Sequence, residues 1–516
     1  MRRYKHKMPH GRNTTFNLGK IVPIGRMLAT RNETFMHGTS TFFRVNHLQF
    51  PVMHPVNIYT KQVQVPLDLI WEDFRDFISG GEDNDDTSVH PYIDFSGSPV
   101  TAGSLANHLG FPVGFAGLAS ALPFRAYVLY WNEHVRDDQL QAKVAMSLAS
   151  GEDTTTLGGI DGSTACLNDN WDKDPFTSAR PDDQLGTDVT IPIGTSAPVV
   201  GTGKALGLTD GTNETGMATS GSGNLYGNTG TLGLDVGDAQ GGGTNLQNSD
   251  AIGLSTIAAN SGAIADLANA TGLTLSQLAF AIQEGRLKEY INKTGNDYDD
   301  FLRRYGVRYD DPRLGRPKIL ASSKTTIQFS EVIQTAPSID DTSAESVASL
   351  KGHGIGFNKS NRYMEYIKED SIILTLCCVK PIPMYMESVD RTLTPMTRFE
   401  FYQREYENVG MQEIPNKLVQ HDHSTPDGTF GYEDRYNHYK RIPNTVHGQF
   451  ADNETDWHFA RSFTGDQALN SSFITCNPTD RVFADTSQDH LKVMVKHNCQ
   501  KLSPIRKYAP QILSNL

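Results

Sequence analysis

Apolar and polar residues alternate in several short stretches of this chain, which predicts a body built mainly of β-strands. The alternation is clear near the C-terminus, where Lys492, Met494 and Lys496 separate Leu491, Val493 and Val495. A strand there would pack one face on a core and present lysines on the other. Residues 372–379 are instead apolar without interruption and are followed by Pro381 and Pro383, which predicts a strand buried on both faces.

A long strand is expected at residues 56–67, with an irregularity near its middle. Apolar or β-branched residues occupy even positions from 56 to 60 and odd positions from 63 to 67. A change of parity inside one strand is typical of a β-bulge. The pattern therefore predicts a bulge between the two halves of this segment.

Helical spacing is confined to a few segments. Residues 71–78 place aromatic and apolar side chains one turn apart and are followed by Gly80, a common stop signal. Residues 125–141 predict a second helix. A third begins near Thr274, because Gln277 three residues later completes a capping-box pattern. The charged residues 298–305 are expected to be helical as well, and no repeat of fixed period is found.

Composition distinguishes one segment, residues 151–262. It holds 22 of the 46 glycines, and 14 acidic residues against three basic ones. Its balance of −11 accounts for most of the formal charge of −13, so the rest of the chain carries only −2. A polar, turn-rich stretch of this kind is typical of an exposed excursion from a compact body.

Both ends of the chain are basic. The first 32 residues carry eight Lys or Arg and no acid, and the residues after Asp489 carry five and again no acid. Such charge is either ordinary solvated charge or a surface that faces a polyanion.

Aromatic and basic residues are interleaved over residues 430–441. A cluster of this kind could stack nucleic-acid bases, or its aromatic side chains could pack within an extended or interface segment. We favour the second interpretation. The candidate subunit-interface residues are Phe430, Tyr432, Arg435, Tyr436 and Tyr439.

Several functional classes lack their sequence signatures. No run of about 18 apolar residues occurs, and no apolar stretch follows the basic N-terminus, so neither a membrane span nor a secretory signal is expected. The five cysteines form no metal or redox pattern and are expected to be reduced thiols. His421 and His423 flank Asp422, but turn-forming residues follow, so an exposed loop is favoured over a metal site. Motifs of hydrolases and phosphate-binding loops are absent, and neither an enzyme nor a cofactor is predicted.

An ordered set of segments carries a family resemblance. The clearest are Ile70-Trp71-Glu72-Asp73-Phe74, Leu122-Pro123-Phe124-Arg125-Ala126-Tyr127 and Phe430-Gly431-Tyr432-Glu433-Asp434-Arg435-Tyr436. The others lie at residues 15–19, 22–24, 33–35, 50–53, 65–67, 131–133, 136–137, 174–179, 191–194, 197–199, 311–314, 316–317, 457–460, 463–464, 477–478 and 480–482. Together they resemble the major capsid protein of the Microviridae, small tailless phages with a circular single-stranded DNA genome, and most closely its gokushovirus-like branch.

The resemblance implies a single viral jelly roll, an all-β fold of eight antiparallel strands in two sheets, here with large inserted loops and a few helices. It implies a structural, non-enzymatic protein that assembles with itself, through pentamers, into an icosahedral shell of triangulation number one. Long loops would then wrap neighbouring subunits. The protein would be part of the virion and would be made in the cytoplasm of a bacterial host.

The resemblance also implies which side of the shell the basic termini face. The inner wall of a shell faces packaged single-stranded DNA, where Lys and Arg would bind phosphates without sequence preference. Our candidates for this contact are Arg2, Arg3, Lys5, Lys7 and Arg12, followed by Lys501, Arg506 and Lys507. The other partners implied are a small basic internal DNA-binding protein, a vertex or pilot protein, and a host cell-surface receptor.

We expect one discontinuous jelly-roll domain. Residues 1–150 would supply the N-terminal arm, the first strands and inserted helices, and residues 263–516 a helical insertion, the remaining strands and a basic C-terminal arm. Residues 151–262 would form a glycine-rich surface insertion. Within it, residues 201–261 match nothing in the family. By position they resemble the family's threefold protrusion, which makes them the candidate for host attachment.

Two alternatives stay open at this point. A phage spike or fibre protein that binds a receptor would form trimers or pentamers and stop, rather than give closed particles. A secreted carbohydrate-active enzyme with a jelly-roll domain would need a signal peptide and a cleft with paired carboxylates.

Overall fold

The computed structural model describes residues 3–81, 83, 85–186, 189, 275–295, 298–306, 316–333, 335 and 350–508, together with short strands between residues 199 and 265. The chain divides into two compact units. The first comprises Met1–Asp183 with Ile291–Leu516, and the second comprises Gln184–Tyr290.

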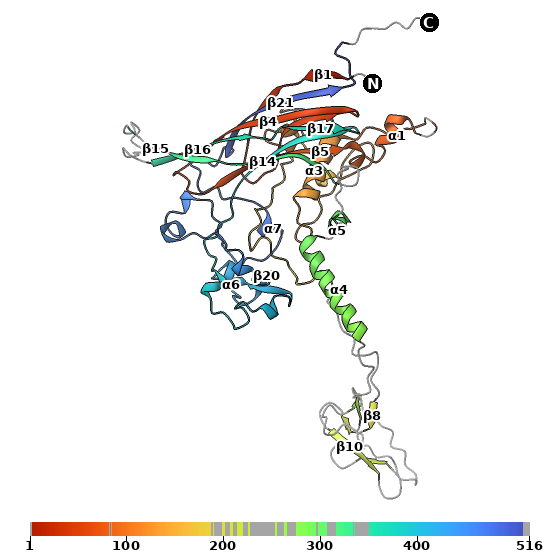
Figure 1. Cartoon of the computed structure of the whole chain (residues 1–516), viewed down its shortest axis with the longest axis vertical. Helices are drawn as coiled ribbons and strands as arrows, with labels where there is room; N and C mark the ends of the chain where they lie inside the picture. The colour runs from red at the N-terminus through yellow and green to blue at the C-terminus, as the bar shows by residue number, and fades with distance from the viewer. Residues whose placement is uncertain are drawn as a thin grey trace. The chain divides into compact units, whose positions relative to one another are not determined.

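The first unit contains two antiparallel sheets that face each other (Figure 1). The larger sheet has seven strands, which are β1 Tyr4–Lys7, β21 Leu491–Ser503, β4 Glu33–Val45, β16 Leu350–Lys359 and β15 Gln328–Ile333 in spatial order, with β2 His10–Phe16 beside β21 and β17 Tyr363–Ile367 beside β4. The smaller sheet has four, in the order β14 Lys318–Thr326, β5 Val56–Pro66, β18 Ser371–Pro381 and β3 Val22–Ala29.

This arrangement confirms the predicted jelly-roll class, with more strands than the eight that were expected. The larger sheet gains strands because β21 and β4, of 13 residues each, are long enough to pair with two shorter strands along one edge. Strands β1 and β2 share β21 in this way, and β16 and β17 share β4.

Two strand predictions are confirmed and one is wrong. Every residue of β18 is buried, and β21 alternates between buried and exposed residues from Leu491 to Cys499. The predicted bulge in β5 is absent from its pairing with β18, where the register is continuous from Val56 to Pro66. The irregularity lies instead in β14, between Ile319 and Ala321. The parity in β5 changes because both of its faces are covered, so apolar residues can point to either side.

The expected helices are present with shifted ends. Helix α1 Phe74–Ser79 ends at Gly80, whose φ is 90°, and α4 Leu275–Thr294 and α5 Tyr298–Arg304 lie where helices were predicted. Thr274, the predicted start of α4, is outside the described residues. Helix α3 is Leu122–His134 rather than 125–141, and all its residues from Leu122 to Asn132 are buried, so it lacks the expected single apolar face.

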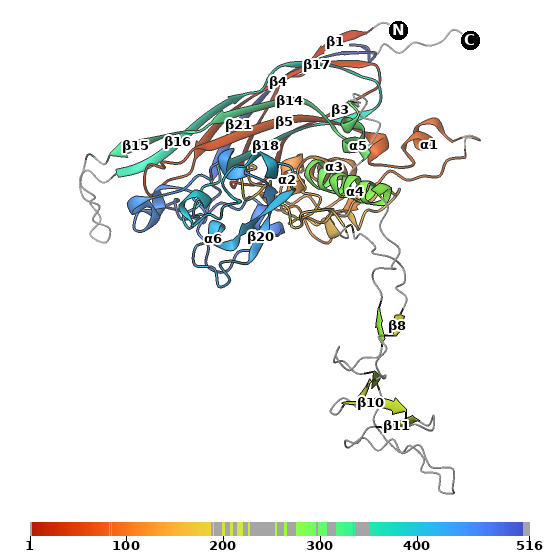
Figure 2. The same cartoon turned by 60° about the horizontal axis from the view of Figure 1, so that its bottom comes forward.

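The smaller elements of the first unit belong to its insertions. They are α2 Leu105–Leu109, α6 Asn416–Val419 and α7 Ser471–Ile474, the strand pair β6 Tyr92–Asp94 and β7 Leu118–Ser120, and the strand pair β19 Met411–Pro415 and β20 Thr429–Asp434. Figures 1 and 2 show α3, α6 and β20 on the side of the smaller sheet, and β1 and β4 on the other side. The insertions therefore cover one side of the two-sheet body.

The second unit has short antiparallel strands. Strand β8 Val199–Gly201 pairs with β13 Ala263–Ala265, and a four-stranded sheet has the order β11 Leu225–Gly227, β10 Glu214–Thr219, β9 Gly207–Thr209 and β12 Gly253–Leu254. The other residues of the candidate protrusion, 201–261, lie outside the described part of the chain.

The interior of the first unit combines apolar clusters with a polar layer between the sheets. Gln62 of β5 donates from Nε2 to Oγ1 of Thr39 in β4 at 2.8 Å, and Asn358 of β16 donates from Nδ2 to Oγ1 of Thr60 at 2.9 Å. These bonds join strands of opposite sheets, so they fix how the sheets sit against each other. All five cysteines are buried and free. None of the described helices is both long and apolar enough to cross a bilayer.

Candidate nucleic-acid interface

The two basic ends of the chain meet at one edge of the larger sheet. Strand β1 pairs with the end of β21, with Tyr4 opposite Ser503 and Lys7 opposite Gln500. A hollow of about 570 Å³ at this edge is lined by Lys5, His6, Lys7, Met8, Lys501, Ile505, Lys507 and Tyr508. The structure therefore brings together four of the eight predicted DNA-binding residues, which come from opposite ends of the sequence.

The remaining predicted residues of the termini are placed differently. Arg3 and Arg506 are exposed near this edge, and Arg3 donates to Oγ1 of Thr34 at 2.9 Å. Arg2 lies outside the described residues. Arg12 is turned inward, where its Nη1 donates to the carbonyl oxygens of Pro23 and His108. Burial, together with the nearby Arg26, lowers the pKa of Arg12.

Lys501 has an internal partner. Its Nζ lies 2.8 Å from Oε1 of Glu33, a fully buried residue, and the Lys501 side chain is only 12% exposed. Burial alone would raise the pKa of Glu33, but hydrogen bonds from Lys501 and Ser503 and the charge of Lys501 lower it. Lys501 therefore serves mainly to satisfy a buried carboxylate.

The larger sheet presents a basic outer face beyond this edge. Residues in register across β2, β21, β4 and β16 form rows, one being Thr15, Lys492, Arg44 and Ile355, and another Gly11, Lys496, Ser40 and Lys359. The parity that faces outward also includes Lys5 and Lys7 of β1. We call the six exposed residues Lys5, Lys7, Arg44, Lys359, Lys492 and Lys496 the basic face.

No outward position in these seven described strands is Asp or Glu. Their three acidic residues, Glu33, Glu331 and Glu365, all have the parity of the inner face. Glu365, for example, lies 2.9 Å from Lys318 of the smaller sheet. The positive charge of the basic face is therefore not offset by carboxylates within the same strands.

An apolar row crosses the basic face between its two charged rows. Asn13, Met494, Phe42 and Phe357 are in register across four strands. The exposed fractions are 56% for Met494, 37% for Phe42 and 57% for Phe357. Proteins that bind single-stranded nucleic acids use exposed aromatic rings to stack the bases and neighbouring cations to contact the phosphates. The alternation at 491–496 predicted the lysines, but pairing with β4 and β16 was needed to find the row.

Two buried histidines, His37 and His497, lie behind this face, between the sheets. Nε2 of His37 lies 3.2 Å from Nδ1 of His497, and the rings of His10 and His497 stack with centroids 4.6 Å apart. Burial, followed by the neighbouring histidines, lowers the pKa of His37 to about 3. Burial lowers the pKa of His497 to about 4. Both imidazoles are therefore neutral at neutral pH.

The candidate interface residues of the aromatic segment have divided roles. Phe430 and Tyr436 are buried, and the ring of Phe430 packs edge-on against Phe473 at 5.0 Å. The Arg435 guanidinium is half-buried and lies 5.4 Å from the Tyr436 ring centroid. Tyr439 is 53% exposed. Of the candidates with aromatic rings, Tyr439 is the most exposed.

Sequence reasoning missed a second group of exposed aromatic residues beside this segment. Phe399, Phe401 and Tyr402 are each about half exposed, and the main-chain N–H of Gln403 donates to the Tyr436 hydroxyl at 3.2 Å. The signal was the density of aromatic residues at 399–406. Their proximity to Tyr436 depends on a fold that sequence alone did not give.

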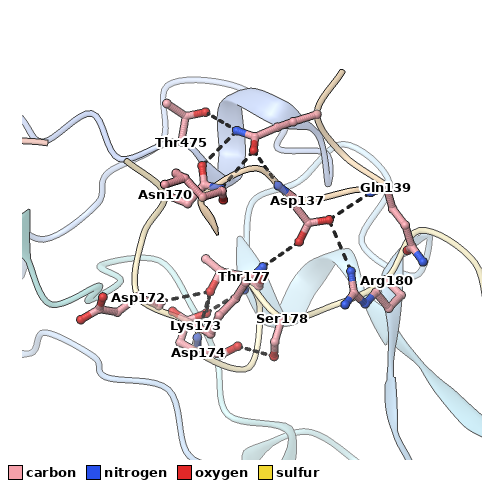
Figure 3. Close-up of polar contacts among 12 residues, drawn as sticks. Asp137, Gln139, Asn170, Asp172, Lys173, Asp174, Thr177, Ser178, Arg180 and Thr475 are labelled. Carbon is pink, nitrogen blue, oxygen red and sulfur yellow. Dashed lines mark hydrogen bonds and ion pairs between the residues drawn. The ribbon is translucent and has the colours of Figure 1, made fainter. Parts of the chain in front are cut away.

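Tyr432 pairs with Arg180, which belongs to a polar network centred on Asp137 (Figure 3). Its backbone exchanges two hydrogen bonds with Arg180, of 2.9 and 2.8 Å. Asp137 lies at the centre of the network, 2.8 Å from Nζ of Lys173 and 3.3 Å from Nη1 of Arg180. Burial raises the pKa of Asp137, but the two cations and hydrogen bonds more than offset this and lower it. The network therefore links β20, through the main chain of Arg180, to the segment at Asp137 that follows α3.

The loop at 421–423 shows no metal-ligating arrangement. His421 and Asp422 are exposed in a turn. Within the described residues, no group of three or more His, Cys, Asp or Glu side chains is placed to hold a metal ion.

The whole chain is similar to capsid proteins of small phages. Residues 1–513 match the family described as Capsid protein (F protein). Capsid protein VP1 of Bdellovibrio phage phiMH2K is 30% identical over 504 residues, which cover 95% of this chain and 91% of the relative. Capsid protein VP1 of Chlamydia phage 1 is 26% identical, over 99% of this chain and 95% of the relative. Capsid protein VP1 of Spiroplasma virus 4 is 26% identical, over 92% and 87%.

These matches extend over nearly the full length of both partners, so they concern the whole fold and not one module. The resemblance to capsid proteins of the Microviridae is confirmed, and the alternatives of a spike protein and a carbohydrate-active enzyme find no support. The role of the protein is structural, it assembles with itself into a shell, and its place is the virion. The chain belongs to the capsid protein (F protein) family.

Proposed function

We propose that this protein forms an icosahedral shell of triangulation number one, built from pentamers, around circular single-stranded DNA. The basic face and the joined termini line the inner wall. The observation that carries this proposal is the absence of acidic residues from the outward positions of the larger sheet, while six Lys and Arg side chains are exposed there. A sheet face of this kind attracts a polyanion.

The distribution of insertions supports the same orientation. In the described part of the chain, helices and loops cover the smaller sheet, whereas the larger sheet is left open over much of its outer face (Figure 2). Long insertions suit contacts with neighbouring subunits and with the exterior. An uncovered flat face suits a partner that is itself extended and irregular, such as packaged DNA.

The finer partners follow from this orientation. A small basic internal protein would share the neutralisation of DNA, and a vertex or pilot protein would join the shell. The insertion at 201–261 would contact a host cell-surface receptor. The protein would be made in the cytoplasm of a bacterial host and would catalyse no reaction.

A salt titration tests the basic face. The full-length chain, purified before assembly, is titrated with a short single-stranded oligonucleotide at several salt concentrations. The double variant Lys492→Gln/Lys496→Gln should reduce the slope of log affinity against log salt by about 1.4, or about 0.7 for each lost phosphate contact. The matched control, Lys440→Gln/Arg441→Gln, removes two exposed charges from the insertions and should leave the slope unchanged. Equal slopes for the two doubles would contradict the proposal.

Electron microscopy tests the assembly and attachment. The expressed protein should give uniform small closed particles, and a population that stops at trimers or pentamers would argue against the proposed shell. Deletion of residues 201–261 should impair attachment to the host more than assembly. Loss of particles on this deletion would place the segment in the shell wall instead.

A further inference from the structure

A second hollow, of about 490 Å³, lies among the C-terminal insertions and has no lining residue in common with the basic face. Its walls are two chain segments, residues 459–464 and 477–481, with contributions from Trp171, Gln467, Ser472 and Thr475. Its position is fixed by the fold, because Gln141 donates from Nε2 to Oγ1 of Thr475 at 3.2 Å and so anchors one wall to the network in Figure 3.

Two guanidinium groups line this hollow, and both are oriented by neutral oxygen atoms. Arg461 donates from Nη2 to the Phe473 carbonyl at 2.8 Å, and the Phe473 ring lies 4.1 Å from its guanidinium carbon. Arg481 donates from Nε to the Thr455 carbonyl and from Nη2 to the Ala460 carbonyl, both at 2.8 Å. A guanidinium has five N–H donors, so each group retains donors beyond these bonds.

Neither guanidinium forms a direct ion pair within the described residues, although the charge of Asp456 acts on Arg481. The one carboxylate in the lining, Asp480, lies 3.1 Å from Nε2 of His490, and its side chain is 59% exposed. Two partly buried cations thus share a hollow in which no described carboxylate forms a direct counter-ion. An anion from outside the protein would supply one, and charge-assisted bonds from Arg to phosphate are among the stronger hydrogen bonds in proteins.

The rest of the lining is rich in uncharged hydrogen-bonding groups. These are the hydroxyls of Ser462, Thr464, Ser472, Thr475 and Thr479 and the amides of Gln467 and Asn477. The volume is far greater than an inorganic phosphate ion needs and falls within the range of small-molecule sites, about 300–1,000 Å³. The ligand should therefore carry polar groups in addition to its charge.

We propose that this hollow binds a phosphorylated organic anion of nucleotide size. Arg461 and Arg481 would bind the phosphate, and the hydroxyl and amide side chains would bind the sugar and the base. Such a ligand could be a free nucleotide or one nucleotide unit of a single strand. The inference does not depend on the basic face, since it concerns different residues on different chain segments.

Calorimetric titration of the full-length chain tests the site, with dAMP, inorganic phosphate and deoxyadenosine as probes. We expect saturable binding of dAMP, weaker binding of inorganic phosphate, and binding of deoxyadenosine about tenfold weaker or less, because it lacks the charge. Equal binding of dAMP and deoxyadenosine would overturn the role of the two arginines. Equal binding of dAMP and inorganic phosphate would contradict the proposal that the ligand is of nucleotide size. No binding of either would contradict the proposal that the hollow is a binding site.

A charge variant locates the binding without disturbing the arginines, whose bonds to main-chain carbonyls also support the fold. Thr464→Glu adds a carboxylate at an exposed position of the lining and should weaken dAMP binding about tenfold or more. The control Ser79→Glu adds the same charge at an exposed position of α1 and should leave binding within about twofold. Equal binding by both variants would place dAMP elsewhere and overturn the proposal.

A deoxyadenosine oligonucleotide distinguishes the two sources of the ligand. If Thr464→Glu weakens its binding as it weakens that of dAMP, the hollow accepts a nucleotide unit of a strand. If the oligonucleotide binds Thr464→Glu normally, the hollow accepts the free nucleotide. The variant Lys492→Gln/Lys496→Gln should leave dAMP binding unchanged, so failure of the basic face and failure of this site give different results.

Discussion

The smaller sheet and the larger sheet are built from similar strands but end in different surroundings. Strand β18 of the smaller sheet is buried at each of its residues, whereas β21 of the larger sheet alternates between buried and exposed residues over most of its length. Helix α2 contacts β3, and α3 contacts β5 and β18, so the chain covers its own smaller sheet. Among the described residues, the outer face of β21 has no comparable cover, and it carries Lys492, Met494 and Lys496.

The difference shows where this chain keeps a surface for something other than itself. A covered sheet needs apolar residues on both faces, and its side chains are committed to internal packing. An open sheet needs only one apolar face, and the other can be shaped by a partner. In this protein the outward positions of the open sheet's strands hold no acidic residue, so the pattern of burial and the pattern of charge point to the same side of the molecule.

The largest expected effect is on the covered side. Arg125 of α3 and Asp153 are both fully buried at their side chains and lie 2.7 Å apart. Arg125 also donates to the carbonyl oxygens of Ile70 and Ala149, so it joins three chain segments over the smaller sheet. Replacing Arg125→Ala leaves a buried unpaired carboxylate and should lower the free energy of unfolding by about 3–5 kcal/mol. Denaturant unfolding of the purified chain measures the change.

A surface ion pair provides the control for this prediction. Arg75 and Asp68 lie 2.6 Å apart, but the Arg75 side chain is 70% exposed. Arg75→Ala should cost no more than about 1 kcal/mol. If the two variants cost the same, the cover over the smaller sheet does not depend on its internal ion pair.

The layer between the two sheets should make the protein sensitive to acid. The pKa values of His37 and His497 are lowered by burial to about 3 and about 4. Because the folded pKa lies below the ordinary value of about 6.5, the folded protein binds fewer protons than the unfolded one. The stabilisation is complete above about pH 6.5 and is lost as the pH falls toward 4, by about 3 kcal/mol for His497 alone.

Unfolding measured between pH 7 and pH 4 tests this sensitivity. The variant His497→Gln should flatten the pH dependence even if it lowers stability at pH 7, since Gln does not titrate. His421→Gln, at an exposed turn, is the control and should leave the curve unchanged. A wild-type stability that is constant over this range would contradict the prediction, because it would mean that folding does not lower the pKa values of these histidines.

The affinity for single-stranded DNA should fall more when an apolar residue is lost from the row on the open face than when one is lost elsewhere. Phe357 is 57% exposed and lies between the charged rows, where a base can stack on its ring. Phe357→Ser should weaken binding of single-stranded DNA by about 1 kcal/mol, or roughly fivefold, and should affect duplex DNA less because its bases are already stacked. Ile442→Ser removes a residue that is 74% exposed on the insertions and should change neither affinity. Equal losses for single-stranded and duplex DNA would limit this face to phosphate contact.

Sequence patterns predicted the strands whose burial is regular. The continuous apolar run of β18 and the alternation in β21 are direct consequences of two covered faces and one covered face. The same reasoning failed in β5, because a strand covered on both faces places no constraint on the parity of its apolar residues. It also failed to bound α3, since a helix buried on all sides has no polar face to mark its limits.

The candidate interface was predictable in composition but not in geometry. Charge counts identified the basic termini, yet only the pairing of β1 with β21 shows that they form one edge. They could not reveal that Arg12 and Lys501 are turned inward, because those positions depend on Glu33, Pro23 and His108 in distant segments. The arginine-lined hollow was missed for the same reason, since no local pattern distinguishes Arg461 and Arg481 from other arginines.

The last expected effect is on the covered side. Ser104 caps α2 by accepting a hydrogen bond on its Oγ from the N–H of Asn107 at 3.2 Å, and the residue is buried. Helix α2 packs against β3, so it is part of the cover of the smaller sheet. Ser104→Ala should lower the free energy of unfolding by about 1 kcal/mol, the usual cost of a lost cap. Ser79→Ala, at an exposed helix end, should cost much less.

DNA binding should be the same for both variants, because covering elements reach the basic face only through the core. A change in DNA affinity with Ser104→Ala would mean that the two sides of the molecule are coupled, and the division between a self-covered sheet and a partner-facing sheet would have to be replaced by a single cooperative unit.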